Sequence, residues 1–198
     1  MTNTVLKVVD SYDYQQQAIQ LMNPALDAKG RLTNCALGLC DEAFEVSQIF
    51  FDDTGHPTLR LDDSRKARLI DECGDMFWYL SGLAHTLEYR LDDITDVNEY
   101  NSLALKNFDL AGEWYLLSEE CATIAGIVKK HVFQEHPLDS EKVSILVMCI
   151  RDIAFRVVDI VEYAGSNFKD CATKNLIKLR KRYPSGKFCA KASIDRPV

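Results

Sequence analysis

Residues 63–90 read DSRKARLIDECGDMFWYLSGLAHTLEYR. Apolar side chains recur along this stretch at the spacing of an α-helix, so the sequence predicts a long helix with one face in a core. That face also carries a carboxylate, at Glu72, and a buried carboxylate costs free energy unless its charge is compensated. The residues that define this face are Glu72, Met76, Tyr79 and Leu83.

Outward from this stretch, the rest of the chain shows the same helical pattern. It has only 9 Gly and 5 Pro, and no segment alternates long enough with the period of two that a β-strand requires. We therefore expect one all-α helical bundle over residues 1–198, with a loose tail in the last dozen residues. Asn34, Asp63 and either Asp139 or Ser140 are the expected N-caps. The expected helices span about 11–22, 34–52, 63–90, 93–107, 110–134, 139–164 and 168–183.

Composition narrows the class of protein. With 198 residues, 47% of them apolar, the chain can bury a sizeable core as one domain. Its 23 Lys+Arg and 30 Asp+Glu give a net charge of −7, which argues against nucleic acid and anionic lipid as partners. No apolar run approaches the roughly 18 residues that would span a membrane. Seven cysteines without a CxxC motif, in a chain without an apparent export signal, indicate reduced thiols and a cytoplasmic protein.

The sequence also matches itself without a gap at an offset of 77 residues. We interpret the match as two degenerate copies of one helical unit, the first over about 34–108 and the second over about 111–188, so that the fold would be an intramolecular dimer. The alternative is that two amphipathic helices match by chance. The aligned pairs are Leu39 with Leu116, Glu42 with Glu119, Leu69 with Leu146, Asp75 with Asp152, Asp93 with Asp170 and Asn98 with Asn175.

Two pairs of acids stand out in the first copy, Glu42 with Glu45 and Glu72 with Asp75. A spacing of three residues places both members of a pair on one helical face, so two neighbouring helices can present four carboxylates to one point. Such a group would be strongly repulsive without a cation, and Mg²⁺ prefers carboxylate oxygen and water. For any single pair the alternative is a solvated helix face. A di-iron site is disfavoured, because no Glu is followed by His three residues later.

These motifs, in this order, resemble the paired motif of the MazG-like nucleoside triphosphate pyrophosphohydrolases, Glu-Glu-x-x-Glu followed by Glu-x-x-Asp. They stand at 36–46 (ALGLCDEAFEV), with Asp41 in place of the leading Glu, and at 71–80 (DECGDMFWYL). The first expected helix, with Tyr14, and the ending at 175–188 (NLIKLRKRYPSGKF) also look like this family. The resemblance implies a fold of MazG-like helical units.

The resemblance also implies an activity, the Mg²⁺-dependent hydrolysis of a ribo- or deoxyribonucleoside triphosphate to the monophosphate and pyrophosphate, for control of the nucleotide pool. Mn²⁺ would substitute for Mg²⁺. A carboxylate of the first pair, Glu42 or Glu45, would orient or deprotonate the water that attacks the α-phosphorus. The sequence does not identify the base or the sugar of the nucleoside triphosphate. The implied metal ligands are Glu42, Glu45, Glu72 and Asp75.

The same resemblance places substrate contacts at the end of the chain. Lys178 and Arg182, four residues apart on one helical face, would neutralise the phosphates. Asn175 would lie near the base. Separately, Trp78 and Tyr79 follow the end of the second acidic pair by three and four residues and would flank a base. Trp78 would stack on this base, although large aromatics at helical spacing are core residues more often than not.

The two copies depart from the family pattern in complementary ways. After Asn98 the first copy lacks the Lys and Arg of the ending, and the second copy has Ala122 and Cys149 where metal ligands would stand. We infer that the first copy supplies the metal site and the second supplies the phosphate contacts, an arrangement that resembles the dimeric dUTPases. The alternative function is a catalytically degenerate helical module that binds a nucleotide or a protein partner. A homodimer is also left open.

Overall fold

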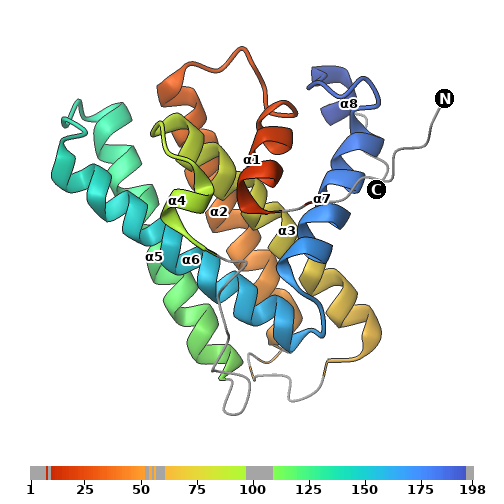
Figure 1. The fold of residues 1–198 in the computed structure, drawn as a ribbon. Helices are drawn as coiled ribbons and strands as arrows, with labels where there is room; N and C mark the ends of the chain where they lie inside the picture. Colours follow the sequence, from red (N-terminus) through yellow and green to blue (C-terminus); the bar gives the residue numbers. More distant parts are fainter. Residues whose placement is uncertain are drawn as a thin grey trace.

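The computed structural model describes residues 8, 10–51, 54, 56, 61–96 and 109–194. Of these residues 77% are helical and none lies in a strand, which confirms the expected all-α class (Figure 1). No helix among them is long and apolar enough to cross a lipid bilayer. The helices in chain order are α1 (Ser11–Ile19), α2 (Ala28–Phe50), α3 (Asp63–Thr86), α4 (Leu91–Ile94), α5 (Leu110–Phe133), α6 (Ser140–Tyr163), α7 (Phe168–Arg182) and α8 (Ala190–Ile194).

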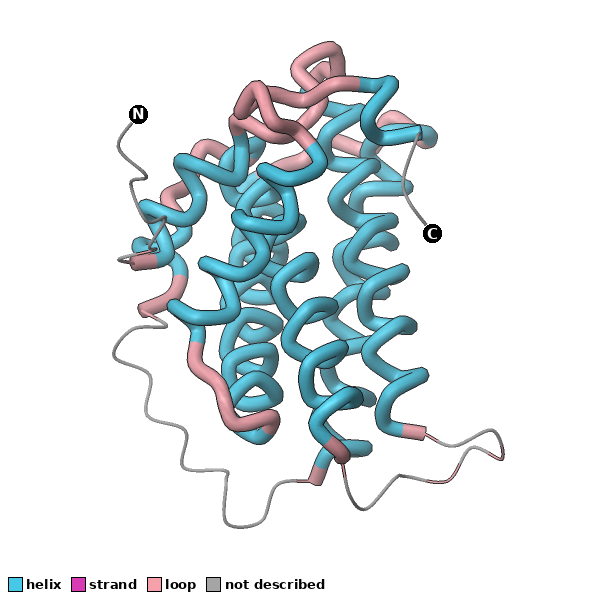
Figure 2. Tube along the Cα trace, turned by 90° about the vertical axis from the view of Figure 1, so that its right-hand side faces the viewer, coloured by secondary structure: helices cyan, strands magenta, loops and turns pink. Residues whose placement is uncertain are grey.

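The core lies between four long helices that contact one another around a ring, in the pairs α2 with α3, α3 with α6, α6 with α5 and α5 with α2. Figure 2 shows the long helices running side by side. The helix α3 also contacts α1, α4 and α7, so it is the central element of the bundle. Its apolar face is fully buried at Met76, Leu80 and Leu83, where it meets Leu39 of α2 and Ile153 of α6 in one continuous core.

Side-chain caps explain where most of these helices begin. Asp27, Asp62, Asp139 and Asn167 each accept a hydrogen bond from the backbone N–H three residues later. The prediction that Asp139 is an N-cap is confirmed. The prediction of Asp63 as an N-cap is wrong by one residue, because the cap is Asp62. The prediction of Asn34 as the N-cap of the second helix is also wrong.

The helix α2 begins at Ala28, well before the expected start at residue 34. The residues before Asn34 are mostly good helix formers, and Leu32 among them is buried, so packing extends the helix back to a cap at Asp27. At the other end α2 stops at Phe50, two residues before the expected end.

The expected helix over 63–90 ends early, at Thr86. Glu88 has a positive φ of 65°, and the N–H of Tyr89 donates to the carbonyl of Ala84, which closes the last turn in the Schellman manner. This stop is hard to predict from the sequence, because the position that favours glycine holds Glu88.

The remaining boundaries differ in smaller ways. The first helix ends at Ile19, earlier than residue 22, whereas the helices expected at 110–134, 139–164 and 168–183 agree to within one residue at each end. Of the helix expected at 93–107, α4 covers only the start, Thr95 is already extended, and residues 97–107 lie outside the described part of the chain. The short helix α8 occupies part of the expected tail.

The helix α7 crosses α3 at a glycine, and this crossing positions the site described below. A Cβ built on Gly74 would lie 2.9 Å from the Cβ of Asn175, closer than real side chains approach. The absence of a side chain at Gly74 therefore lets α7 pack directly on the backbone of α3.

We predict opposite effects for two Gly→Ala substitutions in helices. Gly74→Ala should lower the free energy of unfolding by about 1–3 kcal/mol, because α7 must shift away from α3. Gly126→Ala in α5 is the matched control: a Cβ there meets no atom within 4 Å, so it should raise stability by about 0.5–1 kcal/mol. Urea denaturation of both variants measures the difference. Stabilisation by both would show that the crossing is not tight.

Candidate functional site

The residues that the sequence predicted as metal ligands come from α2 and α3 and meet where these helices pack together. Glu42 of α2 and Glu72 and Asp75 of α3 each offer a carboxylate oxygen, and these oxygens all lie within 4.8 Å of one another. All three residues are half-buried. We call these three residues the acidic cluster. The structure thus brings together three of the four predicted ligands.

The fourth predicted ligand, Glu45, lies one turn further along α2 and is also half-buried. It is not part of the group whose oxygens lie within 4.8 Å of one another. Its charge nevertheless raises the pKa of both Glu42 and Glu72, which places it near them.

The electrostatics of the cluster show an excess of negative charge. Burial, followed by the charges of Asp75, Glu45 and Glu72, raises the pKa of Glu42 to about 9. Burial, with Glu45 as the largest charge effect, raises the pKa of Glu72 to about 7. Burial also raises the pKa of Asp75, although Lys178 opposes that shift. A bound cation is the direct way to stabilise three ionised carboxylates in such a position.

Lys178 of α7 lies at the cluster itself, where the sequence predicted a residue for the phosphates. Its Nζ donates to Asp75 Oδ2 at 2.6 Å and to Asp71 Oδ2 at 2.9 Å. Burial alone would lower the pKa of Lys178, but the contacts with these two carboxylates raise it above its ordinary value. Sequence reasoning missed Asp71, although it stands one helical turn before Asp75 on the same face of α3.

Asn175 is almost fully buried beside Asp75, with 1% of its surface exposed. Its Nδ2 donates to Asp75 Oδ1 at 2.6 Å, and its Oδ1 accepts from the hydroxyl of Tyr14 at 2.7 Å. Both ends of this amide are therefore engaged within the protein. The sequence placed Asn175 near the base of a substrate, and it singled out Tyr14 by resemblance without a role.

The two other predicted substrate residues lie apart from these contacts. Arg182 is half-buried one turn after Lys178, and its guanidinium makes no hydrogen bond or ion pair with the residues that the structure describes. Trp78 donates its indole N–H to the carbonyl of Ala18 at 3.2 Å, which ties it to the end of α1. Its ring lies 4.9 Å from that of Tyr79.

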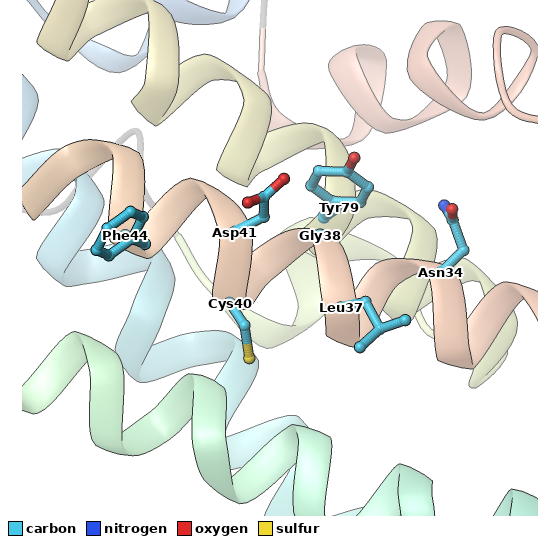
Figure 3. A pocket seen from close by; sticks show the side chains of 7 residues that line it. All are labelled: Asn34, Leu37, Gly38, Cys40, Asp41, Phe44 and Tyr79. Carbon is cyan, nitrogen blue, oxygen red and sulfur yellow. The ribbon is translucent and has the colours of Figure 1, made fainter. Parts of the chain in front are cut away.

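A hollow of about 540 Å³ opens on α2 near the cluster (Figure 3). In Figure 3 Asp41 and Tyr79 lie on the same side of α2. A Cβ on Gly38 would lie 2.2 Å from the Tyr79 ring, so only glycine lets this ring cover α2. Sequence reasoning had placed Tyr79 on the core-facing side of its helix, whereas the structure leaves it half-buried against α2. The lining residues are Asn34, Leu37, Gly38, Cys40, Asp41, Phe44 and Tyr79.

Comparison of the chain with protein-family models, with curated proteins and with solved structures found no match. The acidic cluster and the contacts that α1 and α7 make with it are therefore the features of the protein that indicate a function.

The raised pKa values predict how stability depends on pH in the metal-free protein. Glu42 and Glu72 ordinarily titrate near 4.5 but have folded-state pKa values of about 9 and about 7. Between these values the folded state binds more protons than the unfolded state, so the free energy of unfolding falls as pH rises from 5 towards 9. Urea denaturation in the presence of a chelator should show this decline.

Two variants test the assignment of this pH dependence. Glu42→Gln should make the decline shallower, because it removes the group with the highest carboxyl pKa of the cluster. Glu119→Gln changes an exposed acid at the matching position of α5 and should leave the decline as it is in the wild-type protein. A decline of equal slope in the Glu42→Gln variant would contradict the proposed repulsion within the cluster.

Proposed function

We propose that the protein is a Mg²⁺-dependent nucleoside triphosphate pyrophosphohydrolase of the MazG-like kind, active on a ribo- or deoxyribonucleoside triphosphate in the cytoplasm. The observation that carries the proposal is the acidic cluster with Lys178 at its edge. Oxygen ligands that repel one another suit a hard divalent cation, and a neighbouring ammonium suits a phosphate. The net charge of −7 supports a small phosphorylated substrate over a nucleic acid.

The donor set fits the metal. All of its side chains are carboxylates, which Mg²⁺ prefers and for which Mn²⁺ can substitute. Glu42, Glu72 and Asp75 would hold the ion, and Glu45 would join them after a change of its side-chain rotamer. When bound, the metal would supply positive charge against the phosphates and make a water molecule more acidic.

The chain's own residues supply the other parts of the reaction. A carboxylate oxygen of Glu42 or Glu45 accepts the proton of the water that attacks the α-phosphorus. Lys178 exchanges its contact with Asp71 for a phosphate oxygen, and Arg182, one turn away, takes a second one. These cations stabilise the charge that develops on the leaving pyrophosphate, so that positioning and electrostatics carry most of the catalysis.

We also propose that the fold arose from two copies of one helical unit. The bounds of α3, shifted by 77 residues, coincide with those of α6. The N-caps Asp62 and Asp139 correspond at the same offset, as do Glu88 and Gly165, which both have a positive φ. Chance similarity between amphipathic helices does not require matching caps and matching stop signals at one offset. These features support a duplicated unit.

The second copy supports a division of labour between the copies. Glu119 is exposed, Ala122 offers no carboxylate and Cys149 is buried, so α5 and α6 do not repeat the acidic cluster. The helix α7 of this copy instead crosses to α3 and brings Lys178 to the first site. Because the site is assembled within one chain, it needs no residue of a second subunit. A homodimer is therefore compatible with this arrangement.

The loss of acids from the second copy also favours one other function, a helical module that binds a nucleotide without hydrolysing it. A panel of the common ribo- and deoxyribonucleoside triphosphates, each with Mg²⁺ or Mn²⁺, separates the two functions. Release of pyrophosphate from any of them supports the enzyme and names its base. Nucleotide binding without turnover supports the module.

The two matching acids of the copies provide a sharper test of the active site. We expect Glu42→Gln to lower the rate of pyrophosphate release by about 10²-fold or more, because it removes a ligand and a candidate base. Glu119→Gln, at the same position of the second copy, should stay within about twofold of wild type, as expected for a surface substitution. Equal losses in both variants would mean that the first copy holds no special site.

The two cations of α7 should differ in their effects. Lys178→Ala removes a positive charge from the acidic cluster, and this relief of repulsion toward a cation outweighs the lost contact with Asp75, so Mn²⁺ should bind at least as tightly while turnover falls. Arg182→Ala should raise KM and leave the affinity for Mn²⁺ unchanged. Isothermal titration calorimetry and steady-state kinetics measure the two effects. Full activity in the double variant would show that the basic ending only stabilises a helix terminus.

A further inference from the structure

Tyr14, Asn175 and Asp75 form a chain of hydrogen bonds that joins three helices. The hydroxyl of Tyr14 on α1 contacts Asn175 on α7, and the amide of Asn175 donates to Asp75 on α3. Tyr14 is fully buried and Asn175 almost so, which leaves little access for water as an alternative partner. The ring of Tyr14 is held by an edge contact with Phe168 at a centroid distance of 6.3 Å.

The direction of these hydrogen bonds is set by the chemistry of the groups. The carboxylate of Asp75 only accepts while it is ionised, so the amide of Asn175 must present Nδ2 to it. This orientation leaves Oδ1 facing Tyr14, and a buried carbonyl oxygen requires a donor. Burial raises the pKa of Tyr14 well above its ordinary value, so its hydroxyl keeps the proton that it donates.

The chain of bonds fixes one edge of the Asp75 carboxylate, while Lys178 fixes the other. Oδ1 accepts from Asn175 at 2.6 Å and Oδ2 accepts from Lys178 at 2.6 Å. A carboxylate held at both oxygens cannot rotate about its terminal bond, so its orientation toward Glu42 and Glu72 is set before any ligand arrives. Such outer partners strengthen metal binding in proteins by holding the ligand in place.

We propose that Tyr14 and Asn175 are positioning residues, which orient Asp75 for a divalent cation without contacting the cation or the substrate. The hydroxyl of Tyr14 acts on Asp75 through Asn175, and its longer contact with the carbonyl of Gly74, at 3.3 Å, reaches only the backbone of α3. Asn175 takes this positioning role in place of the expected contact with the base of the nucleotide, because both ends of its amide are engaged inside the protein. The test of this inference by metal binding rests on the proposed function, whereas the test of the hydrogen bonds themselves does not.

The chain offers a matched control for the loss of a buried tyrosine hydroxyl. Tyr183 has only 2% of its surface exposed, follows the end of α7, and pairs its hydroxyl with that of Ser193 at 2.8 Å. Tyr14→Phe and Tyr183→Phe therefore each remove one buried hydroxyl and keep the ring. Only the first of them touches the chain of bonds to Asp75.

Calorimetric titration with Mn²⁺ tests the positioning role. We expect Tyr14→Phe to weaken binding about tenfold and Tyr183→Phe to leave it within twofold of wild type. The double variant Tyr14→Phe/Asn175→Ala should bind as weakly as Asn175→Ala alone, because Tyr14 acts through Asn175. Wild-type affinity in Tyr14→Phe, or equal losses in both tyrosine variants, would overturn the proposal.

A second measurement keeps the inference testable if wild-type protein binds no Mn²⁺, an outcome that would refute the proposed function. In the NMR spectrum of wild type, the side-chain amide of Asn175, assigned by its absence in Asn175→Ala, should exchange slowly with solvent. Tyr14→Phe should shift this signal and speed its exchange, and Tyr183→Phe should not. An unchanged Asn175 signal in Tyr14→Phe would overturn the chain of hydrogen bonds itself.

Discussion

The mutual repulsion of half-buried carboxylates is the constraint on which the rest of the site depends. Glu42, Glu72 and Asp75 lie within reach of one another, and burial raises the pKa of each. The charges of neighbouring carboxylates raise the pKa of Glu42 and Glu72 further. A bundle that only needed a core would place apolar side chains at these positions. The sequence keeps acids there and arranges two other helices, α1 and α7, around them, which is the arrangement expected of a binding site for a cation.

The surrounding structure meets this constraint from α7 and α1. Lys178 partly neutralises the cluster, and Asn175 supplies a donor to the oxygen of Asp75 that Lys178 does not reach. Both contacts require α7 to lie close to α3, and Gly74 makes that approach possible. Tyr14 then connects α1 to the same point. Packing, electrostatics and hydrogen bonding therefore converge on Asp75.

The helices and the candidate carboxylates could be predicted from the sequence, whereas the contacts between helices far apart in the sequence could not. The all-α class and the boundaries of the last long helices follow from periodicity, because apolar spacing and N-caps are local signals. The early start of α2 at Ala28 and the stop of α3 before Glu88 do not, because they depend on packing and on a non-glycine residue in a left-handed turn. The spacing of the acids within each helix also identified Glu42 and Glu72 as candidate metal ligands. It could not show that Lys178 pairs with Asp71, since that contact joins residues more than a hundred positions apart.

We propose that this cluster directs water to the α-phosphorus of a nucleoside triphosphate. Hydrolysis in ¹⁸O-labelled water, followed by mass spectrometry of both products, identifies the phosphorus atom that is attacked. Attack at the α-phosphorus puts the label into the nucleoside monophosphate and leaves pyrophosphate unlabelled. Label in the pyrophosphate would move the attack to the β-phosphorus, and orthophosphate as the main product would refute a pyrophosphohydrolase.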